Sequence, residues 1–221
     1  MSLNLLLDSG DPKKWRKWLQ LGIFNGITTN PKLLLQAGQP CNIENLKKLS
    51  ETAKEIQCKE LHLQAWGETP LEVTKCGLKI AELSTASLKV HVKIPITKQG
   101  CEAAKELIKS NISVTLTACY EVKQIIIASA IGANYVAPYL GRINDTGRDG
   151  MADLIIMEKI LNNTSSSCKL LVASVREAQE INTLASHGIK TFTINNEIAE
   201  DLFTSKATQK AYEEFEKATN A

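Results

Sequence analysis

Short β-like runs alternate with helix-like segments from one end of the chain to the other, and no other feature of the sequence limits the fold as strongly. Eight runs are rich in β-branched and aliphatic residues. They cover residues 3–8, 26–29, 60–65, 88–95, 112–117, 134–139, 170–174 and 190–194. A regular strand-helix repeat predicts a parallel sheet. No Ser/Gly-rich linker divides the repeats, so we expect a single domain over residues 1–221.

Side-chain alternation within the runs separates a closed barrel from an open sheet. Strands of an open parallel sheet are covered by helices on both faces and are apolar throughout. In residues 88–95 one face carries Val90, Val92 and Ile94, and the other carries Lys89, His91 and Lys93. A polar face suits the interior of a barrel that becomes wet toward its C-terminal mouth. No GxGxxG or Walker A motif supports a nucleotide-binding open sheet. The pattern therefore predicts a single (β/α)8 barrel, the TIM-barrel fold.

An extra helix is expected after the eighth unit, in the segment ATQKAYEEFEKATN. Tyr212, Phe215 and Ala218 share one face of that helix. This face either folds back on its own barrel or crosses to a neighbouring chain.

Composition and charge exclude several classes of protein. Lys and Arg total 26 against 24 Asp and Glu, a net charge of +2 with no long run of either sign, which does not mark a nucleic-acid surface. No apolar stretch approaches the roughly 20 residues that span a bilayer, and the apolar run at the N-terminus is too short for a signal peptide. The six cysteines have no CxxC spacing, which indicates reduced thiols. We expect a cytoplasmic protein that binds neither nucleic acid nor membrane.

Lys93 is the strongest catalytic candidate. It lies near the end of the fourth run, in VHVKIPI, on the polar face. A lysine among packed strands is partly desolvated, which lowers its pKa and makes the neutral amine available as a nucleophile. The alternative is a structural ion pair, for which Asp8 is one candidate partner.

Other polar residues end the neighbouring runs, at the face where barrel enzymes assemble their active sites. They are Asp8, Thr28, Thr29, Asn30, Gln64, Thr117, Tyr139 and Ser174. Each has a simpler explanation alone, such as a helix cap for Asp8 or a turn residue for Asn30. Together, an acid, several hydroxyls and an amide around one amine suit carbonyl chemistry.

Two further groups of residues suggest ligand sites. Arg142, Arg148 and Arg176 follow the sixth and seventh runs and are suited to hold a phosphate, unless they are ordinary surface arginines. His62 and His91 share inward parity on adjacent runs, so with Asp8 they offer an alternative divalent-metal site. Two histidines without a nearby third ligand are more often core residues.

The motifs resemble the transaldolase and fructose-6-phosphate aldolase family of small Schiff-base aldolases. They are LLLDSG near the N-terminus, GITTNP at 26–31, VHVKIPIT at 90–97, NYVAPYLGRINDTGRDG at 134–150 and LVASVR at 171–176. They occur in the family's order on the expected strands, and the resemblance covers nearly the whole chain.

The resemblance implies an imine between Lys93 and the C2 ketone of a ketose phosphate. Asp8 matches the residue that exchanges the C4 hydroxyl proton, and Gln64, Thr117 and Tyr139 match the residues around the catalytic water. Asn30 and Ser174 match ligands of the dihydroxyacetone hydroxyls, and Thr28 shapes the adjoining turn. Arg142 and Arg176 match the phosphate site. The resemblance implies no metal, no organic cofactor, and a ring-like homo-oligomer of pentamers that can stack into decamers.

The reaction within the family rests on conflicting markers. Gln64 and Tyr139 match the aldolases, whereas transaldolases usually have Glu and Phe there; the GRINDTGRDGM loop instead matches small transaldolases. We expect a transaldolase of the non-oxidative pentose phosphate pathway, with fructose-6-phosphate aldolase as the alternative and a non-catalytic sugar-phosphate-binding barrel as a distant one. Departures from the family pattern at Lys32, Val175 and Asn195–Asn196 concern substrate fit more than the imine step.

Overall fold

A computed structural model describes residues 3–219 of the chain and contains eight parallel strands. The strands are β1 (Asn4–Asp8), β2 (Gly26–Thr28), β3 (Glu60–Gln64), β4 (Lys89–Pro95), β5 (Val114–Cys119), β6 (Tyr135–Pro138), β7 (Lys169–Leu170) and β8 (Thr191–Ile194). Their order in the sheet is β7-β6-β5-β4-β3-β2-β1-β8, so each strand pairs with its neighbours in sequence and β1 also pairs with β8. Val172 closes the ring, because it bridges Phe192 of β8.

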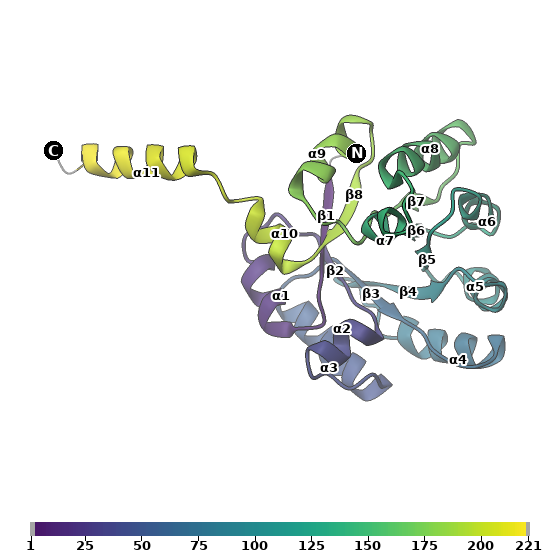
Figure 1. The fold of residues 1–221 in the computed structure, drawn as a ribbon. Helices are drawn as coiled ribbons and strands as arrows, with labels where there is room; N and C mark the ends of the chain where they lie inside the picture. The colour runs from purple at the N-terminus through teal and green to yellow at the C-terminus, as the bar shows by residue number, and fades with distance from the viewer. Residues whose placement is uncertain (1–2, 220–221) are drawn as a thin grey trace.

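Helices surround the strands and confirm the predicted (β/α)8 barrel (Figure 1). They are α1 (Pro12–Leu19), α2 (Pro31–Gln36), α3 (Ile43–Glu55), α4 (Pro70–Ala81), α5 (Lys98–Lys109), α6 (Gln124–Ala130), α7 (Leu140–Asp145), α8 (Gly150–Asn163), α9 (Ala178–Ser186), α10 (Asn196–Asp201) and α11 (Lys206–Thr219). Proline occupies the first position of α1, α2 and α4, where a missing N–H costs no helical hydrogen bond. Two short helices, α2 and α7, carry residues that line the cavity at the C-terminal ends of the strands.

The core has two parts, of which the alternation predicted the larger. The larger part lies between the strands and the helices and contains the aliphatic faces of the strands together with the indoles of Trp15 and Trp18. The smaller part lies inside the barrel and contains Leu6, Tyr135, Ala137 and Leu171. The rest of the interior is polar, which leaves room for a site along the barrel axis.

Six strands agree with the predicted ranges to within one residue at each end, and β5 and β7 differ by more for local reasons. β5 begins two residues later than expected, because Asn111 after α5 has a φ of 58° and the chain turns there before it enters the sheet. β7 ends at Leu170, and the following residues contact the sheet only through isolated bridges at Val172 and Ala173. The chain bends at this point, and Ser174 reaches a φ of 59°.

The extra C-terminal helix is present as α11 and extends away from the barrel (Figure 1). None of its described residues is buried, and Tyr212 and Phe215 are 56% and 70% exposed. The helix therefore does not fold back on its own barrel. Asn220, the last residue of the expected helix, lies outside the described residues. Within residues 3–219, no helix is both long and apolar enough to cross a membrane.

Candidate active site

A cavity of about 800 Å³ opens at the C-terminal ends of the strands, and we call it the mouth cavity. Nine of the residues predicted from the sequence line it: Asp8, Asn30, Gln64, Lys93, Thr117, Tyr139, Arg142, Ser174 and Arg176. They come from strand ends and loops spread over the whole ring of strands. The barrel topology therefore brings together the residues that the sequence places far apart.

Lys93 lies near the end of β4 and reaches the floor of the mouth cavity. It is 4% exposed, and its register partners are Gln64 on β3 and Thr115 on β5. Burial lowers the pKa of the Lys93 amine, although the negative charge of Asp8 acts in the opposite direction. A larger fraction of the amine is therefore neutral and nucleophilic than for a surface lysine.

Asp8, at the end of β1, is held by a chain of hydroxyl groups. The Thr28 hydroxyl donates to Asp8 Oδ1 at 2.6 Å and lies 2.6 Å from the hydroxyl of Thr193 on β8. Burial raises the pKa of Asp8, against the opposing effects of the Lys93 charge and the Thr28 hydrogen bond. A carboxyl with a raised pKa is suited to take up and return a proton. Thr28 itself is completely buried, so it positions Asp8 and does not line the cavity.

Thr117 and Tyr139 form a hydroxyl pair on the wall of the cavity. Their oxygens lie 2.9 Å apart, and the ring of Tyr120 packs against Tyr139 at 5.6 Å. Burial raises the pKa of Tyr139, which keeps the phenol protonated and able to donate. Gln64 completes this side of the wall. The arrangement can bind and orient a water molecule beside the amine of Lys93.

Asn30 caps α2 at the opposite side of the mouth. The Leu33 N–H donates to Asn30 Oδ1 at 3.0 Å, and Pro31 begins the helix directly after the cap. The capping bond fixes the orientation of the amide where it lines the cavity.

The cationic rim of the cavity consists of Arg142 and Arg176. Both contact Asp145: Arg176 makes two hydrogen bonds of 2.7 and 2.6 Å to the carboxylate, and Arg142 lies 3.8 Å from it. Gly141 permits this packing, because a Cβ there would lie 2.5 Å from Arg176 Nε and 2.7 Å from the Ser174 carbonyl oxygen. Both guanidinium groups approach one carboxylate, which Arg176 binds through two hydrogen bonds and Arg142 meets only as a longer ion pair, and such a pair of arginines is suited to hold an anion.

Arg148, the third predicted arginine, lies elsewhere. It donates to Glu121 at 2.7 Å, to Asp153 at 2.6 Å and to the Tyr120 carbonyl. It is not among the described residues that line the mouth cavity. Arg148 therefore anchors the loop before α8, and the predicted anion site is reduced to two arginines.

Backbone strain is concentrated beside the cavity. Ala118 and Ser174 both line it and have φ angles of 55° and 59°, in the left-handed region that side chains other than glycine rarely adopt. Such conformations persist where the surrounding structure holds them, often at functional sites. The strain at Ser174 directs this residue into the mouth cavity.

Several lining residues were not predicted from the sequence, among them Gln36, Tyr120 and Thr193. Thr193 had a signal, because it lies on the polar face of the eighth strand. Tyr120 and Gln36 had none, because Tyr120 follows the end of β5 and Gln36 is the last residue of α2, where no pattern separates it from a surface residue.

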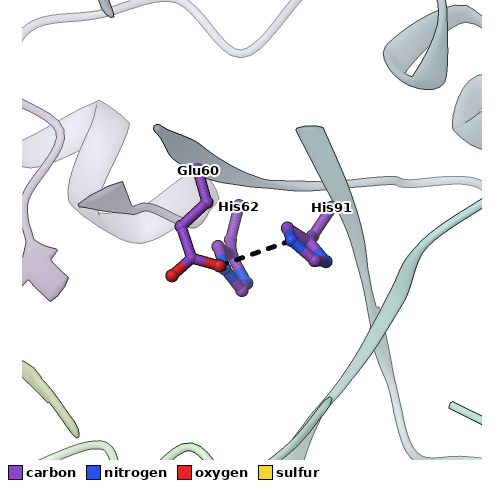
Figure 2. Close-up of side chains that lie close together, drawn as sticks. All are labelled: Glu60, His62 and His91. Atoms are coloured by element: carbon purple, nitrogen blue, oxygen red, sulfur yellow. Dashed lines mark ion pairs between the residues drawn. The ribbon is translucent and has the colours of Figure 1, made fainter. Parts of the chain in front are cut away.

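His62 and His91 lie together on the floor of the barrel, but Asp8 is not their partner. Figure 2 shows the Glu60 carboxylate beside both imidazole rings. Burial and the neighbouring His91 lower the pKa of His62 to about 3. Burial acts to raise the pKa of Glu60, but His62, His91 and Asn4 hold it well below its usual value. The alternative metal site considered from the sequence therefore named the wrong carboxylate. Asp8 lines the mouth cavity, whereas Glu60 is the carboxylate beside the two histidines.

Solved structures with a similar fold share little sequence with this chain, so the similarity concerns the fold alone. Two flavocytochrome b2 mutants, one solved with pyruvate bound, match with TM-scores of 0.60 and 0.56 at 14% and 16% identity. Each match covers 88% of this chain but only 57% and 56% of the solved chain.

The sequence comparisons identify the family. Residues 5–221 match the model described as transaldolase/fructose-6-phosphate aldolase. A probable transaldolase of Caulobacter vibrioides is 30% identical over 213 residues, and one of Chelativorans sp. is 28% identical over 218 residues. Both matches cover 96% of this chain and 94% of the relative. The fold and the site define a barrel with a buried lysine at its mouth. The chain belongs to the transaldolase/fructose-6-phosphate aldolase family.

Proposed function

We propose that the protein is a transaldolase that moves a dihydroxyacetone unit from a ketose phosphate, fructose 6-phosphate or sedoheptulose 7-phosphate, to an aldose phosphate. The observation that carries this proposal is the buried Lys93 amine in a cavity that also contains Asp8 and ends at Arg142 and Arg176. Lys93 and both arginines line the same cavity, so we propose that one substrate presents its ketone to Lys93 and its phosphate to the arginines. We further propose a cytoplasmic location and a place in the non-oxidative pentose phosphate pathway.

The first half of the reaction breaks a carbon-carbon bond. The neutral Lys93 amine adds to the C2 carbonyl, and loss of one water with uptake of one proton from solvent gives a protonated imine. The Asp8 carboxylate then accepts the C4 hydroxyl proton while the C3–C4 bond breaks. The electron pair of that bond moves into the imine to form an enamine, and the aldose phosphate leaves as an aldehyde.

The second half reverses these steps with a new acceptor. The enamine carbon attacks the aldehyde carbon of the acceptor, whose oxygen takes the proton from Asp8. Water then adds to the imine and releases the new ketose phosphate from Lys93. We assign the binding of this water to Gln64, Thr117 and Tyr139. We assign the phosphate of the donor, and then that of the acceptor, to Arg142 and Arg176.

One observation favours fructose-6-phosphate aldolase as a second candidate. The Tyr139 phenol lines the same cavity as Lys93, its oxygen lies 2.9 Å from the Thr117 hydroxyl, and burial raises its pKa, which favours the protonated phenol. A proton delivered from this phenol to the enamine would convert it to an imine that water hydrolyses to free dihydroxyacetone. The enamine can therefore either attack an aldose phosphate, which is the transaldolase reaction, or be protonated and hydrolysed to free dihydroxyacetone, which is the aldolase reaction.

Acceptor dependence distinguishes the two reactions. With fructose 6-phosphate alone, we expect little free dihydroxyacetone; addition of erythrose 4-phosphate should raise glyceraldehyde 3-phosphate formation by at least about tenfold. Both products are measured with coupled dehydrogenase assays. Release of dihydroxyacetone at the full rate without acceptor would instead make the protein an aldolase. Tyr139→Phe, which removes only the hydroxyl, should lower residual release by a larger factor than transfer, because both reactions use the water but only release uses the proton delivered to the enamine.

Thr28→Val tests how Asp8 is tuned. The Thr28 hydroxyl lowers the pKa of Asp8, so its removal raises that pKa further. Asp8 must be ionised to accept the C4 proton, and the acidic limb of the kcat/KM profile should therefore move to higher pH. Thr28→Ser keeps the hydroxyl and serves as the control. An unchanged acidic limb in Thr28→Val would assign that limb to another group.

We also propose that the protein forms a homo-oligomer, a pentamer or a stacked decamer. The exposed Tyr212 and Phe215 on the projecting α11 support an interchain contact, since large apolar side chains of a free helix gain by burial against a partner. Sedimentation velocity should give a mass of five or ten chains. Tyr212→Ser with Phe215→Ser should lower that mass, and a monomeric parent would contradict the proposal.

A further inference from the structure

A second polar cluster lies on the floor of the barrel, at the opposite end from the mouth cavity. Glu60 and His62 are on β3, and His91 is on β4, where it is the register partner of His62. His62 and His91 precede Gln64 and Lys93 by two positions, so they occupy the layer directly beneath the residues of the mouth. None of the three is among the described residues that line the mouth cavity, and the proposed reaction does not use them.

The spacing of the three side chains is that of metal ligands. Glu60 Oε2 lies 3.6 Å from His62 Nε2 and 3.4 Å from His91 Nε2. Metal-ligand bonds of about 2.0–2.2 Å in a tetrahedral zinc site place neighbouring ligand atoms about 3.4 Å apart. An N–H···O hydrogen bond is usually about 2.9 Å long, so both contacts are too long to be good hydrogen bonds.

Buried nitrogen atoms in the cluster also lack partners. Among residues 3–219, His62 Nε2 and His91 Nδ1 have no hydrogen-bond partner, and the two side chains are 0% and 2% exposed. A buried polar atom without a partner carries a substantial free-energy cost. An ion bound between the carboxylate and the imidazoles would satisfy His62 Nε2.

Other side chains orient the three groups. Asn4 Nδ2 donates to Glu60 Oε1 at 2.8 Å, and the Tyr135 hydroxyl donates to Glu60 Oε2 at 3.2 Å. His62 Nδ1 lies 2.9 Å from the hydroxyl of Thr115, which leaves Nε2 directed toward Glu60. Metal-binding histidines and carboxylates are typically supported in this way. The Glu60 side chain is 13% exposed, which provides a route from solvent through the floor.

We propose that Glu60, His62 and His91 bind one borderline divalent cation of the zinc type, through Glu60 Oε2 and the Nε2 atoms of both histidines. Two imidazoles and one carboxylate are a zinc ligand set, whereas Ca²⁺ and Mg²⁺ prefer oxygen ligands. The two rings are stacked, with centroids 4.4 Å apart and planes at 17°. A ring nitrogen binds a metal in the plane of its own ring, so two nearly parallel rings can bind the same ion only after one of them rotates. His91 is the ring that turns, because Thr115 holds His62 and no described residue holds His91 Nδ1.

The bound ion ties β3 to β4 and therefore stabilises the folded chain over the unfolded one. Its role is in the barrel floor and is independent of imine formation at the mouth. The expected result of loading is a raised melting temperature that depends on the Zn²⁺ concentration.

The test uses the full chain after treatment with a chelator. Equilibrium dialysis against Zn²⁺ with elemental analysis should give one ion per chain, and Co²⁺ should give the visible absorption of a tetrahedral nitrogen and oxygen site. Glu60→Gln and His91→Gln should each weaken Zn²⁺ binding by about 100-fold or more and abolish the rise in melting temperature. His187→Gln and Cys41→Ser, which change an exposed histidine and an exposed thiol, should leave binding unchanged.

A variant outside the three ligands keeps the test valid if a buried substitution prevents folding. Tyr135→Phe removes only the hydroxyl that supports Glu60 and should weaken Zn²⁺ binding by about 10-fold. Failure of the chelator-treated protein to bind Zn²⁺ at a 1:1 ratio would overturn the proposal. Equal affinity in the parent and in Glu60→Gln, or sulfur-to-cobalt charge-transfer absorption, would overturn it as well.

Discussion

Lys93→Met should abolish turnover of fructose 6-phosphate, with a loss on the order of 10⁴-fold or more. Methionine fills the same space at the end of β4 but has no amine, so neither imine nor enamine can form. In the parent protein, borohydride reduction in the presence of fructose 6-phosphate should attach the sugar carbons covalently to Lys93. The adduct blocks tryptic cleavage at Lys93, so mass spectrometry should find it on the peptide of residues 90–98. The variant should give no such peptide.

Two controls separate the loss of the amine from other effects of the substitution. Lys93→Arg keeps a positive charge near Asp8 but is not nucleophilic, and it should be as inactive as Lys93→Met. Lys89→Met changes an exposed lysine at the start of the same strand and should retain parental activity. Residual turnover well above background in Lys93→Met, or an adduct on another lysine in the parent, would contradict the imine assignment.

The alternation of side chains along the strands was enough to predict which residues face the barrel interior. Lys93 and His91 are buried on the polar face of β4, while Val92 and Ile94 belong to the core between strands and helices. This works because successive side chains of a strand point in opposite directions, and a parallel barrel brings all C-terminal strand ends to one rim. Parity and strand-end position thus identified the strand-end polar residues of the mouth cavity, which are Asp8, Asn30, Gln64, Lys93, Thr117, Tyr139 and Ser174.

What the sequence could not predict depends on partners far away in the chain. By residue pattern alone Arg142, Arg148 and Arg176 are equivalent candidates, and only the family resemblance selects Arg142 and Arg176. The physical reason lies in the positions of their acidic partners, because Glu121 and Asp153 hold Arg148 away from the cavity. Glu60 has the same parity as His62 but begins its strand, so nothing local separates it from a solvated surface acid.

Tyr120 and Tyr139, which pack together at the mouth, also show that loop geometry cannot be predicted from the sequence. Tyr139 could be assigned from its place at a strand end, whereas Tyr120 reaches it from the loop after β5. A left-handed Ala118 sets the direction of that loop, and alanine has no sequence preference that predicts such a conformation.

Asp8→Asn should lower turnover by about 10² to 10⁴-fold while leaving the imine in place. Asparagine has nearly the same shape and can still accept the hydrogen bond from Thr28, but it cannot accept a proton from the C4 hydroxyl. The negative charge of Asp8 raises the pKa of Lys93, so its removal lowers that pKa further and leaves more of the amine neutral. Imine formation should therefore not be slowed by a protonated amine.

The readout for Asp8→Asn combines steady-state turnover with borohydride trapping. Trapping by fructose 6-phosphate should remain near one adduct per chain, and the trapped sugar should retain all six carbons because the C3–C4 bond stays intact. In the parent, the trapped species should include the three-carbon dihydroxyacetone adduct that follows cleavage. Asp8→Glu restores a carboxylate at a displaced position and should recover part of the turnover. Turnover within threefold of the parent in Asp8→Asn would remove Asp8 from the proton-transfer step, and loss of trapping would place its role before cleavage, in formation of the imine.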